Sequence, residues 1–540
     1  MGRLDMKLLI CFITLFLLLI SSQSLAIQRI QPEDLSYQGA FRLPAQTMNS
    51  SWEYSGYAMT YYPSGDPNGV NDNYPGSLFA VGHDHHQMVS EISIPVPVIS
   101  TTKNVSELNT ASTLQGFQDI TNGMFGSLEI PRAGLAYLAA QGSQSSDKLH
   151  FAWGQHFQGG DTSHGWSELS LTNPNPKGAW IFGNYANYTS NDYLFEVPSS
   201  WSDKYAPGMR IATGRYRDGD WSGHGPALYV YQPWQTDNPP AAGSSISNIK
   251  PLLLYGIQEP GMIEITNNDG MEMEGYSRAD EWSSAAWLTT SEKAAVIFVG
   301  TKAIGESWYG YSNGVVYPIS GDPNDVIPPL PDWPHDDRGW WSADIRARIL
   351  FYDTEDLAEV ATRRINTYDP QPYAYLDIDQ YLYNPGFDYQ RGKRYLIGAA
   401  AFDRSNGYLY IMERLADEDR SLVHVWQLDS NSNNCPTVNN DLRLHIACAQ
   451  YGGDKITASI QAANPSGISS GLNWRLMPLT YGSAETSDTC MQLDSDLLLN
   501  FSCVTYANNQ YSFSLKFLSE SSIDGEFYWS MEVDSLQLAD

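Results

Sequence analysis

Histidine side chains gather in two glycine-rich stretches of the first third of this sequence. His83, His85 and His86 lie in the run GHDHH, directly after a strand-like apolar stretch, and His156 and His164 lie in WGQHFQGGDTSHGW. Histidine titrates near neutral pH, which suits it to act as a general base. A single loop histidine more often only bonds a backbone carbonyl. Their clustering makes His83, His156 and His164 candidate catalytic bases.

A second group of candidates combines a tyrosine with arginines. Tyr193 follows Asn-Asp, Arg210 follows it by seventeen residues, and Arg215 lies in the run ATGRYR. An arginine in an acidic protein usually pairs with a carboxylate, but its planar fork also neutralises a substrate carboxylate or sulfate. Tyr193, Arg210 and Arg215 are therefore candidate catalytic residues. His224, in the glycine-rich turn DGDWSGHGP, is a candidate substrate-binding residue.

A third group suits the binding of sugar rings. Lys302, Trp308 and Tyr309 lie in the glycine-rich run GTKAIGESWYG. Sugar rings stack on aromatic faces, so these three residues could form a substrate-binding lip. The alternative, that the tryptophan only packs between strands, is as probable from the sequence.

Two segments could alternatively bind a metal ion. His83 and His85 are two residues apart and would face the same side of a strand, as ligands of one metal would. Residues 66–73, DPNGVNDN, offer oxygen ligands for a structural calcium ion, but they lack the closing glutamate of an EF-hand loop. A surface turn is the safer reading of residues 66–73. The sequence contains no metalloprotease HExxH and no P-loop.

The elements that must position these groups are predicted to be strands. Residues 27–430 lack long helical periodicity and instead show short apolar or alternating runs between Gly, Pro, Asn and Asp clusters. About 400 residues of this kind predict a β-propeller, with five to seven blades at roughly 40–60 residues each. Residues 36–43 are expected to pair with strands of the last blade, within 396–428, and so to close the ring. Loops at one mouth of such a ring would converge on the central channel.

The chain is expected to be exported. Residues 1–26 combine Arg3 and Lys7 with an apolar run and the cleavage-like end Ser-Leu-Ala, which is typical of a signal peptide cleaved after Ala26. No other segment has the roughly 20 apolar residues that a membrane span needs. We therefore expect no membrane insertion after cleavage, and a secreted or periplasmic location.

Residues 435–540 repeat with a shift of 55. Cys435, Cys448 and Trp474 match Cys490, Cys503 and Trp529 without a gap. This predicts two tandem β-repeats, at 435–489 and 490–540, behind a polar linker. The even number of clustered cysteines in an exported chain predicts disulfides. Pairing within each copy, Cys435–Cys448 and Cys490–Cys503, is the natural arrangement, and pairing between copies stays open. The fold class is thus all-β, a propeller followed by two small disulfide-bearing repeats.

The amino-acid composition limits the classes of partner that we expect. The net charge of −30 disfavours nucleic acid and anionic lipid surfaces. Aromatic residues make up 13% of the chain, too many for disorder and suited to clefts that bind sugars. A polysaccharide or a cell-surface glycan is the expected partner.

Motifs across residues 27–430 resemble a family of large exported bacterial β-propeller proteins of unknown role. That resemblance implies the fold and brings no activity with it. The terminal repeats look like small β-repeats appended to other exported bacterial proteins for attachment. The motifs that carry the resemblance are YQGAFRLP (37–44), SHGW (163–166), NDYLFEVP (191–198), ATGRYRDGDWSGHGPAL (212–228), DEWSSAAWLT (280–289), FVGTKAIGESWYG (298–310), ILFYDTEDLAEVA (349–361) and GAAAFDRSNGYLYIMERLAD (398–417).

More distantly, Tyr193 followed by Arg210 resembles the arrangement in propeller polysaccharide lyases that cleave ulvan. The resemblance implies a histidine and a tyrosine as base and acid, with an arginine that neutralises the uronate. The leading hypothesis is therefore a carbohydrate-active protein, with β-elimination on uronate-containing glycans as its reaction. A propeller that only binds a glycan or protein at the cell surface is the first alternative. A metal-dependent hydrolase that uses the GHDHH run is the second.

Overall fold

The computed structural model describes residues 27–428 with short gaps, and six strands beyond residue 443. The gaps are residues 46–48, 67–68, 70–72, 127–131, 155–158, 217–220, 235–237, 258–264, 267–268, 320 and 392. The chain divides after Leu428 into two compact units, Met1–Leu428 and Asp429–Asp540. The described elements are almost all strands. No described helix is both long and apolar enough to cross a membrane.

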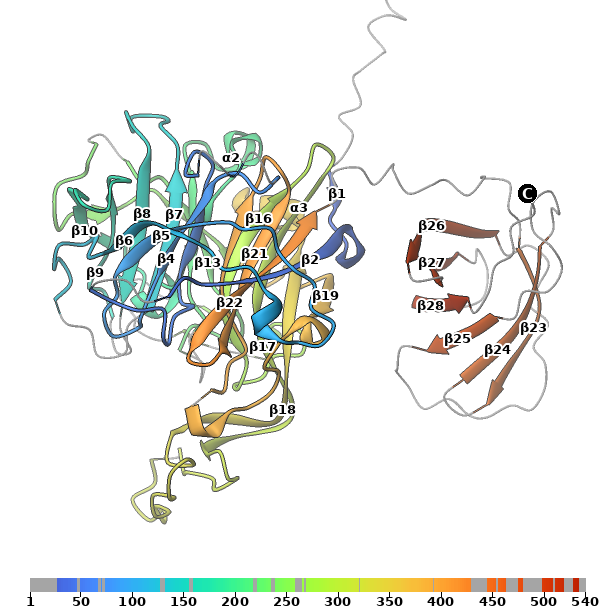
Figure 1. Ribbon diagram of the computed structural model, residues 1–540. Coiled ribbons are helices and arrows are strands. Elements are labelled where there is room, and N and C mark those ends of the chain that lie inside the picture. Colours follow the sequence, from blue (N-terminus) through green and yellow to red (C-terminus); the bar gives the residue numbers. More distant parts are fainter. Residues whose placement is uncertain are drawn as a thin grey trace, which may run out of the picture. The chain divides into compact units, whose positions relative to one another are not determined.

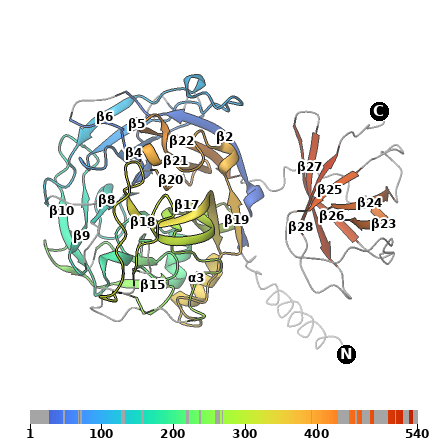
Figure 2. The ribbon, with the colours of Figure 1, turned by 90° about the horizontal axis from the view of Figure 1, so that it is seen from below.

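The first unit is a ring of five antiparallel β-sheets, which makes it a five-bladed β-propeller (Figures 1 and 2). The predicted fold is confirmed, with the blade number at the lower end of the expected range. Blade 1 holds β3 (Met59–Tyr62), β4 (Ser77–Val81), β5 (Val89–Ser93) and β6 (Thr113–Gln118); blade 2 holds β7 (Arg132–Leu138), β8 (Lys148–Gly154), β9 (Thr162–Ser167), β10 (Lys177–Phe182) and the short parallel β14 (Ser245–Ile246). Blade 3 holds β11 (Tyr193–Glu196), β12 (Ile211–Gly214), β13 (Leu228–Tyr231) and β15 (Ile249–Leu253).

Blades 4 and 5 include the strands nearest the start of the described chain. Blade 4 holds β16 (Glu281–Thr289), β17 (Lys293–Tyr311), β18 (Arg338–Tyr352) and β19 (Ala374–Asp377), and β1 (Gln28–Arg29) adds to the start of β17. Blade 5 holds β20 (Ile397–Asp403), β21 (Tyr408–Asp417) and β22 (Arg420–Leu428), with β2 (Leu35–Arg42) as its outermost strand.

The ring is closed by pairing β2 with β22, from Leu35–Leu428 to Arg42–Leu422. This confirms the predicted closure between the first strand and the last blade. A buried chain of polar groups ties the three strands together. Tyr37 Oη lies 2.9 Å from His424 Nδ1, and His424 Nε2 lies 2.9 Å from a carboxylate oxygen of Glu413. Because the hydrogen bonds of this network are made away from water, they favour this pairing of the first and last strands of the propeller over other pairings.

The first strand of each blade is the innermost, and neighbouring first strands contact one another around the central channel. This convergence requires small residues. A side chain at Gly398 of β20 would collide with the carbonyl oxygen of Gly56, which accepts a hydrogen bond from Ala399 at 2.7 Å. A Cβ at Gly134 of β7 would lie 2.6 Å from the carbonyl oxygen of Asp192. Glycine is therefore the residue that permits these approaches.

The blade strands are buried on both faces, because each blade packs between two others. All four residues of β12, all five of β4 and all seven of β8 are buried. Fully buried tryptophans fill the spaces between sheets. Both faces of these strands therefore belong to the core, and their polar residues must be bonded internally.

Among the described residues of this unit, two short helices and several 3-10 turns occupy connections. The cap of α3 is Asp353, whose carboxylate accepts from the backbone N–H of Glu355 at 2.9 Å. The helices are α2 (Ser199–Tyr205) and α3 (Thr354–Ala361), and the 3-10 turns are η1 (Pro32–Asp34), η3 (Val105–Glu107), η4 (Asn187–Thr189), η5 (Asp379–Tyr381) and η6 (Tyr389–Arg391).

The second unit is described only as the backbone of a six-stranded sheet, in the order β23-β24-β25-β28-β27-β26. It consists of two three-stranded sets joined through β25 and β28, and equivalent strands lie about 55 residues apart. The two tandem repeats stay a prediction. Cys435 and Cys490 lie outside the described residues, so the disulfides also stay predictions. The strands are β23 (Leu444–Gly452), β24 (Lys455–Ala462), β25 (Trp474–Pro478), β26 (Leu498–Ala507), β27 (Gln510–Leu518) and β28 (Tyr528–Val533).

Candidate functional site

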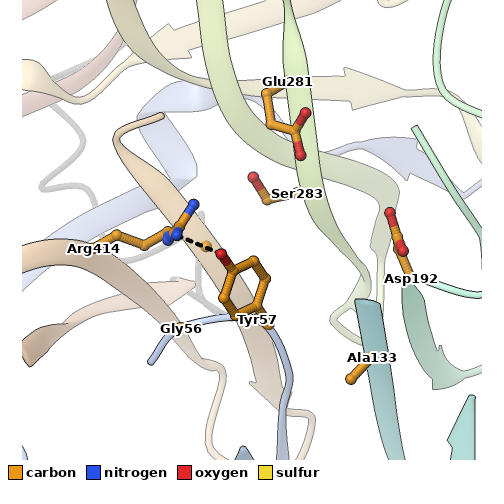
Figure 3. Close-up of a pocket in the computed structure, with 8 residues that line it drawn as sticks. Gly56, Tyr57, Ala133, Asp192, Glu281, Ser283 and Arg414 are labelled. Carbon is orange, nitrogen blue, oxygen red and sulfur yellow. Dashed lines mark hydrogen bonds between the residues drawn. The ribbon is translucent and has the colours of Figure 1, made fainter. Parts of the chain in front are cut away.

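The candidate site is a pocket at one end of the central channel, where the innermost strands begin (Figure 3). We call this end the mouth. Every blade contributes to it from the start of its first strand. The lining residues are Gly56, Tyr57, Ala133, Asp192, Glu281, Ser283 and Gly398, with Arg414 from the second strand of blade 5. The small residues of blades 2 and 5 leave open space, while blades 3 and 4 supply carboxylates.

The loops that contain the residues predicted from the sequence lie on the same side of the propeller as the mouth. First strands run away from the mouth and second strands run back toward it, so the connections from second to third strands lie on the mouth side. The GHDHH run joins β4 to β5, the segment with Arg215 and His224 joins β12 to β13, and the run with Trp308 lies in the β17–β18 hairpin. The topology therefore brings these loops to one face of the ring.

Asp192 is held at the mouth by an arginine. Its carboxylate is only 8% exposed and lies 3.5 Å from Nε of Arg215, whose side chain is 1% exposed. Arg215 also donates to the Asn191 side chain at 3.1 Å. A cation beside a buried carboxylate favours the ionised form of that carboxylate. Arg215, a predicted catalytic residue, is thus paired with a carboxylate of the pocket.

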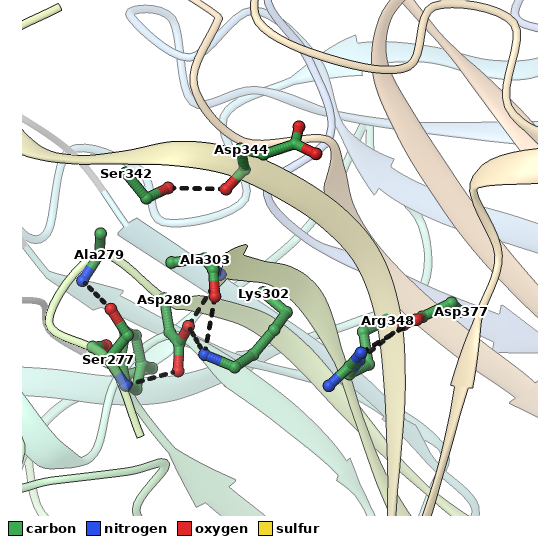
Figure 4. Close-up of polar contacts among 10 residues, drawn as sticks. Ser277, Ala279, Asp280, Lys302, Ala303, Ser342, Asp344, Arg348 and Asp377 are labelled. Atoms are coloured by element: carbon green, nitrogen blue, oxygen red, sulfur yellow. Dashed lines mark hydrogen bonds and ion pairs between the residues drawn. The ribbon is translucent and has the colours of Figure 1, made fainter. Parts of the chain in front are cut away.

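Glu281 lies at the start of β16 and is 6% exposed. The preceding residue, Asp280, is fully buried and accepts from Lys302 Nζ at 2.7 Å and from the backbone N–H of Ala303 at 2.9 Å (Figure 4). Burial raises the pKa of Asp280, although the charge of Lys302 opposes that rise. This bridge ties β16 to β17 beside Glu281. Lys302, predicted to bind substrate, is engaged in it.

Arg414 and Tyr57 form the opposite wall of the pocket. Nη2 of Arg414 donates to the Tyr57 hydroxyl at 2.7 Å, and its guanidinium lies 4.5 Å from the centre of the Tyr57 ring. Figure 3 shows this pair facing Asp192, Glu281 and Ser283. The pocket volume is about 10 Å³, which is room for about one water molecule. A larger substrate would therefore lie above the pocket, against its rim.

Two of the predicted catalytic residues are buried inside the blades. His164, in β9, is 1% exposed, and its ring stacks on Phe182 at 4.7 Å. Tyr193, in β11, is 2% exposed and donates to the carbonyl oxygen of Ala227 at 2.6 Å. The structure does not bring these two side chains to the mouth.

The other predicted residues are also separated from one another. Arg210 precedes β12 and lies toward the far end of blade 3, bonded to Gln141, Ser202 and Asp203. His224 stacks on Tyr276 at 4.8 Å. His156 lies outside the described residues.

The GHDHH turn packs against the segment that leads to Tyr57. His83 stacks on His86 at 4.6 Å and meets Tyr54 edge-on at 5.6 Å, and its Nδ1 lies 3.0 Å from Asp84. Burial lowers the pKa of His83, although Asp84 opposes this. Within the described part of the chain, no group of three His, Cys, Asp or Glu side chains is arranged so that it could hold a metal ion. Most of residues 66–73, the proposed calcium turn, lies outside the described residues.

The β17–β18 hairpin carries an aromatic platform on the mouth side of blade 4. The Tyr309 ring lies 5.6 Å from Trp340 across the hairpin and 6.1 Å from Tyr317. Arg338 lies over Tyr317 at 4.2 Å. Trp308 is half-buried and donates to the carbonyl oxygen of Tyr311 at 3.0 Å. Tyr309 thus belongs to a half-exposed set of aromatic rings, as a sugar-binding lip requires.

Comparisons with known proteins give no further information on this site. No model of a known protein family matches the chain, and no curated protein matches it. The resemblances drawn from the sequence stay predictions.

Four pocket residues were not among the predicted site residues: Tyr57, Asp192, Glu281 and Arg414. Three of them share one signal, which is a polar residue at the first position of a blade's innermost strand or just before it. Asp192 precedes the buried run of β11, and Glu281 opens β16. Arg414, near the end of β21, has no such signal.

Two buried histidines predict how stability depends on pH. Burial lowers the pKa of His164 from 6.5 to about 3, and burial, with the charges of Lys148 and His164, lowers that of His150 to about 3. The unfolded chain takes up these protons below pH 6.5 but the folded chain does not, so stability falls as the pH drops from 6.5 toward 3. Each histidine contributes a slope of about 1.4 kcal/mol per pH unit.

The measurement is denaturant unfolding of the propeller between these pH values. His164→Gln should reduce the slope of the free energy of unfolding against pH by the contribution of one titrating group. This holds even if the substitution lowers stability at pH 7. An unchanged slope would show that His164 is already protonated in the folded state.

Proposed function

We propose that this protein is an exported glycoside hydrolase that acts on neutral polysaccharides at the mouth of its propeller. The observation that carries the proposal is the presence of two nearly buried carboxylates, Asp192 and Glu281, on neighbouring blades of one pocket. Hydrolysis of a glycosidic bond commonly uses two such groups. One donates a proton to the leaving oxygen, and the other acts as nucleophile or activates water.

The surroundings suggest which carboxylate does which. Asp192 lies beside Arg215, so its ionised form is favoured and it is assigned as the base or nucleophile. Glu281 is assigned as the acid that protonates the leaving oxygen. Arg414 and Tyr57 would bind sugar hydroxyls from the opposite wall.

The charge of the pocket supports a neutral substrate. Two carboxylates line the mouth with one arginine, and the whole chain carries a net charge of −30. A polyanionic glycan would be repelled from such a surface. This weighs against uronate-rich polysaccharides as the main substrate.

β-Elimination is the second candidate reaction, because of one specific contact. The Tyr57 hydroxyl lies 2.7 Å from Arg414 Nη2, so a tyrosine and an arginine do face one pocket, although they are not the pair expected from the sequence. Tyr57 would remove and return the proton, and Arg414 would neutralise the uronate carboxylate. The reaction products distinguish this proposal from hydrolysis.

The test is incubation of the purified protein with arabinan, xylan, galactan, mannan and β-glucan, and with uronate-containing polysaccharides. Hydrolysis produces new reducing ends without ultraviolet absorbance, whereas elimination produces reducing ends together with absorbing unsaturated uronates. Binding without either product would leave a glycan-binding propeller, and would contradict both reactions.

The platform on the hairpin gives a separate prediction about binding. Trp340→Ala removes a half-exposed ring that lies beside Tyr309, and we expect it to weaken glycan binding about tenfold, because each stacked ring contributes roughly 1 kcal/mol or more. Affinity electrophoresis in gels that contain the glycan measures the change. Tyr375→Ala, an exposed ring of β19, is the control and should migrate like the wild type. Equal retardation of all three proteins would exclude the platform from binding.

A further inference from the structure

The far end of the central channel, opposite the mouth, opens into a cavity of about 570 Å³. It lies where the innermost strands end, and all five of these strands contribute to its lining. Cavities of this size hold small molecules. None of the carboxylates assigned to the reaction lines it.

The inner wall of the cavity is made of small and aromatic side chains. Ala285 and Ala286 of β16 and Ala400 and Ala401 of β20 leave the channel wide at this level. The half-buried aromatic residues Tyr137 and Phe402 also line the cavity. A flat apolar ring face beside open space suits the C–H face of a sugar ring.

The rim is polar, and its charges are compensated. Arg404 lies 3.7 Å from Glu196 and donates to Thr289 Oγ1 at 2.7 Å. Lys293 pairs with Asp34 at 2.7 Å. Asp403 is fully buried, and its carboxylate accepts a hydrogen bond from the side chain of Asn406 at 2.7 Å. The rim therefore attracts neither anions nor cations strongly.

Hydroxyl groups complete the rim. Ser199, Ser200, Ser291 and Ser405 are exposed residues of the lining, and Thr290 is half-exposed. A hydroxyl both donates and accepts a hydrogen bond, so these groups match a ligand whose own groups are hydroxyls. Charged ligands of either sign would gain less here than an uncharged polyol.

We propose that this cavity is a second saccharide-binding site, which takes one or two residues of a neutral sugar. Aromatic faces of Tyr137 and Phe402 contact the ring, and the serine and threonine hydroxyls with Arg404 and Glu196 bond its hydroxyls. The site does not rest on the reaction proposed for the mouth, since a sugar can bind here whether or not the mouth cleaves one.

The test is titration of the full-length protein with glucose, galactose, mannose and xylose, followed by saturation-transfer NMR. We expect saturable binding of at least one sugar, and Phe402→Ala should raise its Kd about tenfold. Ser405→Trp changes an exposed residue, which should leave the fold intact, and its bulk should block entry and remove the signal.

Two control variants separate this site from the mouth. Glu281→Gln should lose the reaction but keep the Kd of the monosaccharide, and Tyr375→Ala should change neither. The proposal is overturned if none of the four sugars binds, or if Ser405→Trp binds as the wild type does. It is equally overturned if Trp340→Ala, at the mouth, abolishes the same signal.

Discussion

Glu281→Gln is expected to reduce the rate of glycan cleavage by about 10²–10⁴-fold, which is the usual contribution of a general acid. The substitution keeps the shape of the side chain and removes its ability to give a proton. Since Glu281 only lines the pocket and the aromatic platform lies on the hairpin, glycan binding should stay within about twofold of the wild type. The measurements are kcat from reducing ends and Kd from affinity electrophoresis, with the best substrate of the panel.

The matched control is Glu359→Gln, the same change at a half-exposed residue of α3 that pairs with Arg364. It should leave kcat unchanged. If Glu281→Gln retained full activity, the carboxylate pair would not be the catalytic machinery. If the wild type released unsaturated uronates and Tyr57→Phe, not Glu281→Gln, lost this activity, elimination would replace hydrolysis.

Much of the fold could be predicted from local patterns. Short apolar runs separated by turn residues are typical of blades, and the run at residues 36–43 had no partner of its own early in the chain. Pairing of β2 with β22 supplies that partner. The number of blades could not be fixed, because β17 and β18 extend beyond their blade as a hairpin with a long connection, and so blade 4 spans far more sequence than blade 1.

The site was harder to predict for a physical reason. In a propeller each sheet is covered on both faces, so chemically capable residues inside strands, such as His164 and Tyr193, are core residues that bond internally. Only the ends of the innermost strands meet the channel. Strand register and the placement of the blades in the ring decide which side chains meet there. Neither can be determined from spacing along the sequence.

The connections between strands are easier to place than the strand interiors. The GHDHH turn joins β4 to β5, the segment with Arg215 joins β12 to β13, and Trp308 lies near the end of β17, so all three lie toward the mouth. Of these residues, Arg215 comes nearest to the chemistry, but it acts through Asp192. The prediction that these residues act on a substrate stays untested, and residue type and loop position do not identify the reacting atoms.

Arg215→Met is expected to destabilise the propeller by about 3–5 kcal/mol, because it leaves the carboxylate of Asp192 with less compensation in a site that is nearly closed to water. The guanidinium is 1% exposed and also bonds Asn191 and the carbonyl oxygen of Asn187. Methionine fills a similar volume, so the loss reports mainly on charge and hydrogen bonding. Urea unfolding at pH 7, followed by tryptophan fluorescence, measures the change in the free energy of unfolding.

The control is Arg364→Met, which breaks a pair whose arginine side chain is 67% exposed and should cost about 0.5 kcal/mol or less. The double variant Arg215→Met with Asp192→Asn removes both charges, and it should recover part of the stability that the single variant loses. Asp192 has two proposed roles, since its carboxylate needs Arg215 for stability and is also assigned to the reaction. If the double variant recovers stability but does not recover glycan cleavage, the two roles are separate. A single variant no less stable than Arg364→Met would show that Arg215 does not compensate the charge of Asp192.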